Sequence, residues 1–242
     1  MVERFAAEAA ILTKIQHPAV VRMYASGVTP DGRPFIAMEW LEGEDLSDRL
    51  MSGRTLTVGE SVAMVRRIAD GLGVTHALGI VHRDLKPSNL FLVNDDPLRV
   101  KVLDFGVARQ SFEAHQMTAT GTALGTPQYM SPEQASGQRV DVRSDVFSLG
   151  SVLFECLAGR PAYPGDNIMA VLTAILLGEV PNLADARADL PAGLSAVLTQ
   201  MMAKKRDERL ADGHAVSRAL SSFGSLRAHA PASRSYKILT LT

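Results

Sequence analysis

The sequence contains the stretch His82-Arg83-Asp84-Leu85-Lys86-Pro87-Ser88-Asn89, which Asp104-Phe105-Gly106 follows downstream. Transfer of a phosphoryl group from ATP needs a carboxylate that orients the attacking hydroxyl, oxygen ligands for Mg²⁺ and a cation near the transferred phosphate. Asp84 can accept or orient the hydroxyl proton, and Lys86 can bring its ammonium to the γ-phosphate. Asn89 and Asp104 offer a neutral and a charged oxygen to Mg²⁺, which prefers hard ligands. The stretch therefore predicts a phosphotransferase that uses ATP and Mg²⁺.

The composition favours one large folded domain that does not bind nucleic acid. The chain has 242 residues, 46% of them hydrophobic, a formal net charge of −1 and a pI of about 6.6. This length allows a substantial core, and no basic surplus exists that would attract nucleic acid or an anionic membrane. No apolar run is long enough for a membrane span. The single cysteine, Cys156, excludes an intrachain disulfide and favours a reducing, cytoplasmic location.

The first part of the chain mixes helical and strand patterns. Residues 3–15 have apolar positions at helical spacing, and His17-Pro18 ends this pattern. Residues 20–27 and 35–40 are rich in residues that favour strands. The turn sequence Thr29-Pro30-Asp31-Gly32 separates them and predicts an antiparallel hairpin.

The rest of the chain is predicted to be mostly helical, with short strands beside the catalytic stretch. Helices are predicted over residues 57–78, 144–157, 166–177, 193–203 and 212–222. Residues 106–132 show no sustained period and predict a long loop. Residues 224–235 have the composition of a linker.

The catalytic stretch, the Asp104-Phe105-Gly106 motif and a later Ser131-Pro132-Glu133 resemble, in order and spacing, the protein kinase family. The similarity runs from about residue 5 to residue 219. It implies an α+β, bilobal protein-kinase-like fold with an intact, mostly helical C-terminal lobe and an N-terminal lobe reduced to one helix and a β-hairpin. The implied boundaries are residues 1–41 for the partial N-terminal lobe, 42–223 for the C-terminal lobe and 224–242 for a linker-like tail.

The resemblance also assigns residues to the nucleotide. Glu8 matches the glutamate that pairs with the ATP-binding lysine, Met38 the gatekeeper, and Glu39-Trp40-Leu41 the hinge whose backbone binds adenine. Phe91 would form the floor beneath the adenine. Asp45 lies where a polar residue often meets the ribose, although a helix N-cap explains it equally well. By pattern alone, Glu8 would be a solvated carboxylate, Met38 the end of a buried strand and Phe91 a core residue.

The loop also indicates the class of acceptor. Lys86 in its Asp-Leu-Lys-Pro-x-Asn context, together with Thr126, resembles the serine/threonine kinases. Residues 124–134 and Ile15-Gln16-His17-Pro18 are most similar to the bacterial, eukaryote-like branch. The resemblance implies transfer of the γ-phosphate of ATP to serine or threonine hydroxyls of a protein substrate. Many such bacterial kinases are anchored in a membrane by a segment that follows the kinase domain.

Arg83 implies regulation by phosphorylation, because in the family an arginine at this position binds a phosphothreonine through charge-assisted hydrogen bonds. Thr118 and Thr120 have the spacing of such sites, and Thr122 is a weaker candidate. Phosphorylation of one copy by another would require a homodimer.

Two further sets of residues are expected to be structural. Asp145 falls in an apolar helix and must be paired there, and in the family it holds the backbone of the catalytic loop around His82 and Arg83. Glu133 and Arg209 match a buried ion pair that joins the end of the activation segment to the last helices. Such a pair fixes geometry more than it adds stability.

Two features of the family are missing. No lysine precedes Glu8, and Lys14 lies on another face of the same predicted helix. A glycine-rich phosphate loop is also missing, because Gly71-Leu72-Gly73 falls within a helical pattern. Since the lysine–glutamate pair is required for transfer, we expect the 242-residue chain to bind ATP weakly and to turn over slowly or not at all.

Several interpretations stay open at this point. An N-terminally truncated active kinase competes with a pseudokinase or regulatory interaction module, and the retention of all catalytic groups favours truncation. A small-molecule phosphotransferase would share the two acids, but Arg83, Lys86 and Ser131-Pro132-Glu133 favour a protein substrate. A purely structural helical module would leave the clustered acids unexplained.

Overall fold

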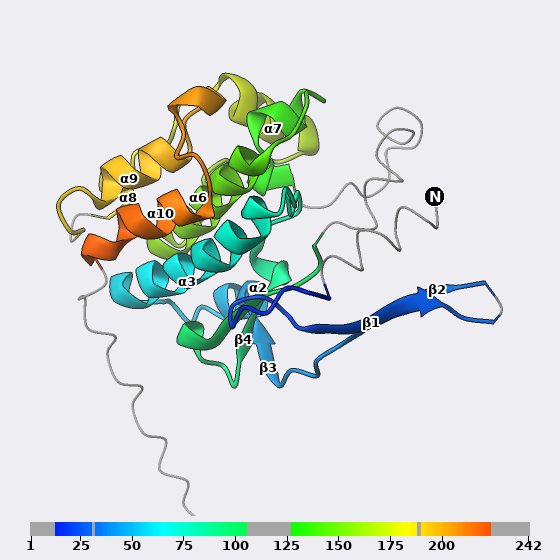
Figure 1. Cartoon of the computed structure of the whole chain (residues 1–242). Coiled ribbons are helices and arrows are strands. Elements are labelled where there is room, and N and C mark those ends of the chain that lie inside the picture. Colours follow the sequence, from blue (N-terminus) through cyan, green and yellow to red (C-terminus); the bar gives the residue numbers. More distant parts are fainter. Residues whose placement is uncertain (1–12, 31, 106–126, 188–189, 224–242) are drawn as a thin grey trace, which may run out of the picture.

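The structure is a computed structural model that describes residues 13–30, 32–105, 127–187 and 190–223 (Figure 1). A two-stranded sheet and a three-stranded sheet lie on one side of a body of helices. The helices are α2 (Leu46–Met51), α3 (Val58–Ala77), α5 (Pro132–Ala135), α6 (Val142–Ala158), α7 (Ile168–Leu177), α8 (Leu183–Ala186), α9 (Leu194–Met201) and α10 (Gly213–Leu220). Short 3₁₀ turns are η1 (Pro87–Asn89), η2 (Pro97–Arg99), η4 (Pro127–Tyr129), η5 (Arg206–Glu208) and η6 (Ser221–Phe223).

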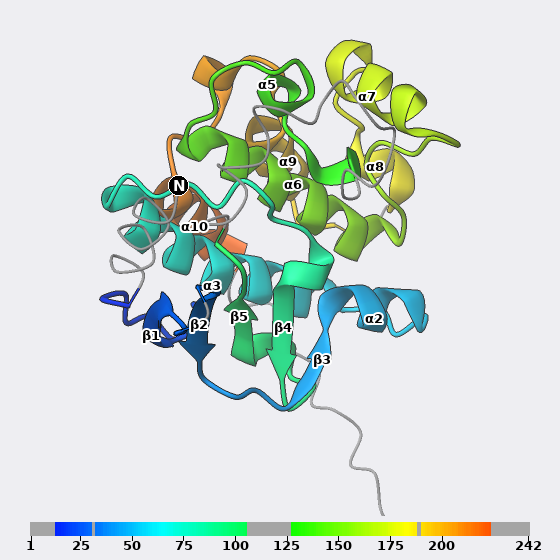
Figure 2. The same ribbon diagram turned by 90° about the vertical axis from the view of Figure 1, so that its right-hand side faces the viewer.

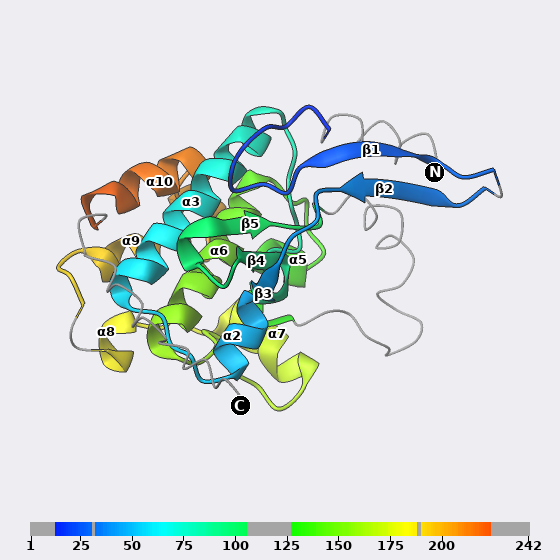
Figure 3. The ribbon, with the colours of Figure 1, turned by 90° about the horizontal axis from the view of Figure 1, so that it is seen from below.

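Strands β1 (Met23–Val28) and β2 (Pro34–Met38) form the predicted antiparallel hairpin. The backbone N–H of Thr29 donates to the carbonyl of Arg33 at 2.8 Å and closes the turn. The hairpin extends away from the helical body (Figure 3). Several of its large side chains are therefore exposed, with Tyr24 at 61% and Phe35 at 43%, whereas Met23 at its base is 5% exposed. Trp40, which the sequence placed at the end of the second strand, lies outside it and is 89% exposed.

Strands β3 (Gly43–Asp45), β4 (Leu90–Val93) and β5 (Val100–Val102) form an antiparallel sheet in that order (Figure 2). Alternation along the strands gives the sheet two different faces. Leu90, Leu92, Val100 and Val102 are all fully buried on one face. The register pairs Asp45 with Phe91, and Phe91 with Lys101, so these three side chains share the other face.

Helices α3 and α6 form the centre of the helical body. Helix α3 begins with a capping box in which Thr57 and Glu60 satisfy each other's backbone N–H groups. Helix α6 is apolar almost all round, which predicts a central position, and Phe147 and Phe154 are completely buried. Gly159 ends α6 in the left-handed conformation. None of the helices in the described ranges is long and apolar enough to cross a membrane.

Gly73 permits the close packing of α3 against α10. A Cβ atom at Gly73 would lie 2.4 Å from Nδ1 of His214, so no larger residue fits without a shift. The Gly71-Leu72-Gly73 segment is therefore part of a packed helix, as the sequence pattern predicted, and does not form a phosphate-binding loop.

The helix predicted over residues 3–15 does not reach Ile15. Thr13 and Lys14 form a turn, and residues 3–12 lie outside the described residues. The physical reason is Pro18, which lacks an N–H for a bond to the carbonyl four residues earlier and disfavours helical backbone at His17. Lys14 is therefore in a turn and not, as predicted, on a helix face.

Candidate active site

Asp145 holds the backbone of the catalytic loop, residues 82–89, as the sequence predicted. Its carboxylate, on α6, accepts the N–H of His82 at 2.7 Å and the N–H of Arg83 at 2.9 Å. Nε2 of His76, on α3, lies 3.0 Å from the same carboxylate. Asp145 and His82 are both fully buried. The start of the loop is therefore fixed by the two central helices.

Asp84, Lys86 and Asn89 meet in the middle of the loop. Nζ of Lys86 lies 2.9 Å from Oδ2 of Asp84. The amide nitrogen of Asn89 donates to the Asp84 carboxylate at 3.1 Å and to the Asp84 carbonyl at 2.7 Å. About a fifth of the Asp84 and Lys86 side chains stays exposed. The carboxylate is thus oriented by two donors and stays partly exposed.

His82 connects the loop to the strand end that carries Asp104. Nε2 of His82 lies 2.7 Å from the carbonyl of Leu103, which can only accept, so Nε2 carries the proton. Nδ1 then accepts the N–H of Asp84 at 3.3 Å. The ring also packs on Phe105 with centroids 4.9 Å apart. His82 therefore connects the backbone at Asp84 to the backbone at Leu103, which precedes Asp104.

Two non-glycine residues of the site have positive φ angles, 68° at Arg83 and 47° at Asp104. Such backbone costs energy and persists where surrounding contacts impose it. At Arg83 the contact with Asp145 supplies one such restraint. The side chain of Asp104 is exposed.

Asn89 and Asp104 fit a Mg²⁺ ion. The amide nitrogen of Asn89 is used by Asp84, which leaves the amide oxygen as the atom that can bind a cation. Asp104 adds a carboxylate. Within the described ranges no three His, Cys, Asp or Glu side chains form a cluster that could hold a metal. Mg²⁺ does not need one, since it binds through one or two carboxylates, waters and substrate phosphates.

The residues assigned to the adenine region lie on and beside the three-stranded sheet. Oε1 of Glu39 lies 2.5 Å from Nζ of Lys101 and accepts the N–H of Arg22 at 2.7 Å. The backbone N–H of Glu39 donates to the carbonyl of Arg22 at 2.9 Å. Glu39 is thus held by Arg22 on one side and by Lys101 on the other. Phe91 and Leu41 are half-buried, which leaves part of each side chain open.

Asp45 is the N-cap of α2, since its side chain accepts the N–H of Asp48 at 2.9 Å, so its predicted capping role is confirmed and its contact with the ribose stays a prediction. Met38 is 42% exposed at the end of β2, so it is not the end of a buried strand. The hairpin extends from the body (Figure 3). Glu8 lies outside the described residues.

The predicted ion pair between Glu133 and Arg209 is present and buried. Both guanidinium NH groups of Arg209 donate to Glu133, at 2.7 and 2.8 Å, and Ser144 donates a third bond. Burial alone would raise the pKa of Glu133, but the bonds from Arg209 and Ser144 outweigh it and lower the pKa. The pair joins α5 to α6 and η5.

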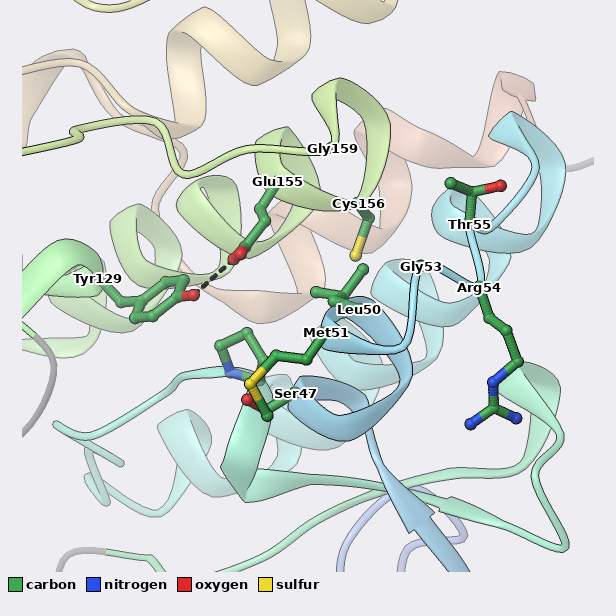
Figure 4. Close-up of a pocket in the computed structure, with 11 residues that line it drawn as sticks. Ser47, Leu50, Met51, Gly53, Arg54, Thr55, Tyr129, Glu155, Cys156 and Gly159 are labelled. Atoms are coloured by element: carbon green, nitrogen blue, oxygen red, sulfur yellow. Dashed lines mark hydrogen bonds between the residues drawn. The ribbon is translucent and has the colours of Figure 1, made fainter.

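A pocket of about 320 Å³ lies beside the catalytic loop, where Pro87 forms part of its wall (Figure 4). The Tyr129 hydroxyl donates to Glu155 across one side of it. Burial raises the pKa of the Glu155 carboxyl, and the bond from Tyr129 only partly opposes this shift. None of the residues assigned to the nucleotide lines this pocket.

Residues 1–220 match the protein kinase domain family. The chain belongs to this family. The kinase domain is 37% identical over 209 residues to the serine/threonine-protein kinase PknH of Mycobacterium bovis, covering 86% of this chain and 34% of PknH. It is 38% identical over 222 residues to Pkn1 of Myxococcus xanthus, covering 91% of this chain and 32% of Pkn1. The chain thus spans about a third of the length of these curated relatives.

A solved structure supports the fold. The crystal structure of Rad53 1-466 in complex with AMP-PNP superposes with a TM-score of 0.73 at 24% identity, covering 90% of this chain and 54% of that chain. This likeness confirms the predicted α+β protein-kinase-like fold. The named relatives confirm the prediction of a serine/threonine kinase domain of the bacterial, eukaryote-like type, an enzyme class that uses ATP.

Sequence reasoning missed several contacts in the kinase domain. Lys101 was not connected to the hinge, although its place opposite Phe91 on a half-exposed strand face could have suggested it. His76 and Glu155 were not singled out. Polar residues within the apolar helical patterns of α3 and α6 are the signal that could have found them, because a buried polar group needs a partner.

Proposed function

We propose that the chain is the catalytic part of a protein kinase that transfers the γ-phosphate of ATP to serine or threonine hydroxyls of proteins. The observation that carries this proposal is the arrangement at Asp84, whose carboxylate is contacted by Lys86 and Asn89 on a loop fixed by Asp145. A scaffold would not require these groups to converge on a partly exposed carboxylate.

In this proposal the chain's own residues position the reacting groups. Asp84 orients the substrate hydroxyl and accepts its proton, and Lys86 places a positive charge at the transferred phosphate. Asn89 and Asp104 would hold Mg²⁺, which would neutralise the developing charge on the phosphates. The backbone of residues 39–41, with Met38, Asp45 and Phe91 nearby, would bind the nucleoside of ATP. Glu8 would complete the nucleotide site.

The same proposal includes activation by phosphorylation of Thr118 or Thr120, which lie outside the described residues. Nε of Arg83 is buried and has no hydrogen-bond partner within the described ranges, and such an arginine can bind a phosphothreonine. One copy would phosphorylate another in a transient homodimer. Mass spectrometry of active protein should find phosphate at one of these threonines, and phosphate-free active protein would contradict this part.

We further propose residues 1–41, 42–223 and 224–242 as the N-terminal lobe, the C-terminal lobe and a tail. We also propose that the kinase domain lies in the cytoplasm, because its substrate ATP is found there. This location holds whether or not another segment of the parent protein is anchored in a membrane.

The test is phosphate transfer from labelled ATP by the whole protein, because the chain spans about a third of its relatives. Asp84→Asn should lower kcat by about 10²- to 10⁴-fold without unfolding the domain. Asp48→Asn, an exposed aspartate in the first turn of α2, is the matched control and should be neutral. Phosphate should appear on peptide serine or threonine and not on tyrosine. Equal activity of Asp84→Asn and the wild type would contradict the proposal.

A further inference from the structure

The peptide group between Arg83 and Asp84 is held at both ends. Its N–H, from Asp84, donates to Nδ1 of His82 at 3.3 Å, a long bond. Its carbonyl, from Arg83, accepts the side-chain amide of Gln134 at 2.7 Å, which is much shorter. This peptide group carries the Asp84 side chain and follows the strained φ of 68° at Arg83. The contact from Gln134 is therefore the stronger restraint on its orientation.

The side chain of Gln134 has a defined orientation. It is the third residue of α5, and its Oε1 accepts the N–H of Ser131 at 3.0 Å and the Ser131 hydroxyl at 3.2 Å in a capping box. The other end of the amide must then donate, and the Arg83 carbonyl can only accept. Glutamate would serve the capping box as well but could not donate to Arg83. Glutamine satisfies both partners.

Helix α5 is a rigid support for this contact. Ser131 is fully buried, and Glu133 next to Gln134 carries the buried pair with Arg209 and the bond from Ser144. The helical body therefore fixes α5, and α5 places Gln134 at the catalytic loop. The 3₁₀ turn η4, which carries Tyr129 of the pocket, lies directly before α5.

We propose that Gln134 is a positioning residue for Asp84: its amide fixes the peptide plane between Arg83 and Asp84 and thereby the direction of the Asp84 carboxylate. Asp145 holds the N–H side of Arg83, and Gln134 holds its carbonyl side. The kinetic consequence rests on the proposed kinase function, whereas the structural consequence does not.

The test compares Gln134→Glu with Ser131→Ala. Gln134→Glu keeps the size and the acceptor for Ser131 but places a carboxylate oxygen against the Arg83 carbonyl. Ser131→Ala removes the hydroxyl of the cap and keeps the backbone N–H that orients Gln134. Gln134→Met removes both contacts and serves as the second variant if Gln134→Glu does not fold.

Amide hydrogen exchange of the 242-residue chain gives the first readout. We expect Gln134→Glu and Gln134→Met to speed exchange of amides 82–84 by about five- to tenfold, from the loss of one hydrogen bond, with α3 unchanged as internal reference. Ser131→Ala should speed exchange within α5 and leave amides 82–84 within about twofold of the wild type. Unchanged amides 82–84 in both Gln134 variants, or an equal effect of Ser131→Ala on them, would overturn the proposal.

Kinetics of the whole protein give the second readout. Gln134→Glu should lower kcat by about tenfold and leave the KM for ATP unchanged, since the contact acts on the base and not on the nucleotide. A rise in KM alone would contradict a role at Asp84. If the wild-type protein transfers no phosphate, the proposed function fails, and the exchange experiment still decides whether Gln134 orders the loop.

Discussion

The catalytic loop and the β1–β2 hairpin differ in how the rest of the molecule holds them. In the loop, His82 is fully buried and Leu85 is 1% exposed, and Asp145 binds two consecutive backbone N–H groups. In the hairpin, Tyr24 and Phe35 are largely exposed, and an isolated two-stranded hairpin is marginally stable in water. Buried contacts with the helical body and with the segment that follows β5 therefore fix the catalytic loop, whereas the hairpin side of the proposed nucleotide region has few buried contacts of its own.

The largest effect is expected from Asp145→Ala. The change leaves the N–H groups of His82 and Arg83 and the ring of His76 without their partner in a buried place, and should reduce the free energy of unfolding by roughly 4–6 kcal/mol. Urea unfolding measures it. Asp141→Ala, which removes the half-buried N-cap of the same helix, should cost only about 1 kcal/mol. Equal losses would mean that the loop is not held as described.

Glu133→Gln should have the next largest effect, because it leaves the Arg209 guanidinium buried without a full charge partner. We expect a loss of about 2–4 kcal/mol at neutral pH. Asp207→Asn, which removes a mostly exposed ion pair with Arg143, should change stability little. A similar loss in both variants would contradict the importance of burial.

The same pair predicts a pH dependence. The pKa of Glu133 is lowered in the folded chain, so its contribution is complete above the unfolded pKa of about 4.5 and is lost as the pH falls through the folded pKa. Wild-type stability should therefore fall more steeply than that of Glu133→Gln below about pH 4.5. Parallel pH profiles of unfolding free energy would exclude this linkage.

A smaller effect is expected at the hinge. Glu39→Gln weakens the contact with Lys101, a partly exposed pair, so stability should change by less than about 1 kcal/mol. In the whole protein the KM for ATP should rise several-fold while kcat changes little. Lys101→Met should have the same effect, and the double variant should add nothing further. Additive effects would show that the pair does not act as a unit.

The smallest effect concerns Cys156, the only cysteine, which lies in α6. Burial raises the pKa of its thiol, so the native chain should resist a thiol reagent at pH 8, and the unfolded chain should bind one equivalent. Labelling of the native chain within seconds would show that the core around Cys156 opens readily, and it would contradict a rigid core beside the catalytic loop.

Sequence separation explains what could be predicted. Asp84, Lys86 and Asn89 lie on one short loop, so their meeting followed from the motif, and the helix predicted over residues 57–78 followed from its local apolar pattern. Glu39 and Lys101 are 62 residues apart, and Gln134 and Arg83 are 51 apart. Such contacts depend on how helices and strands pack, which residue spacing does not reveal.

Local rules also misjudged some residues for physical reasons. Residues 13–15 fit the apolar spacing of the first predicted helix but are not helical, because Pro18 disfavours helical backbone just before it. Met38 looked like the end of a buried strand because strand patterns assume a covered face, and the hairpin extends from the body. The family resemblance did supply Asp145 and the Glu133–Arg209 pair, which no local pattern could have connected.

The most direct measurement of the contrast between loop and hairpin is residue-level amide hydrogen exchange of the 242-residue chain. The account predicts that amides 82–84 are protected nearly as well as those of α6. It also predicts that amides which donate between β1 and β2 exchange at least about a hundredfold faster. Catalytic-loop amides that exchange as fast as those of the hairpin would contradict the claim that buried contacts fix the catalytic loop.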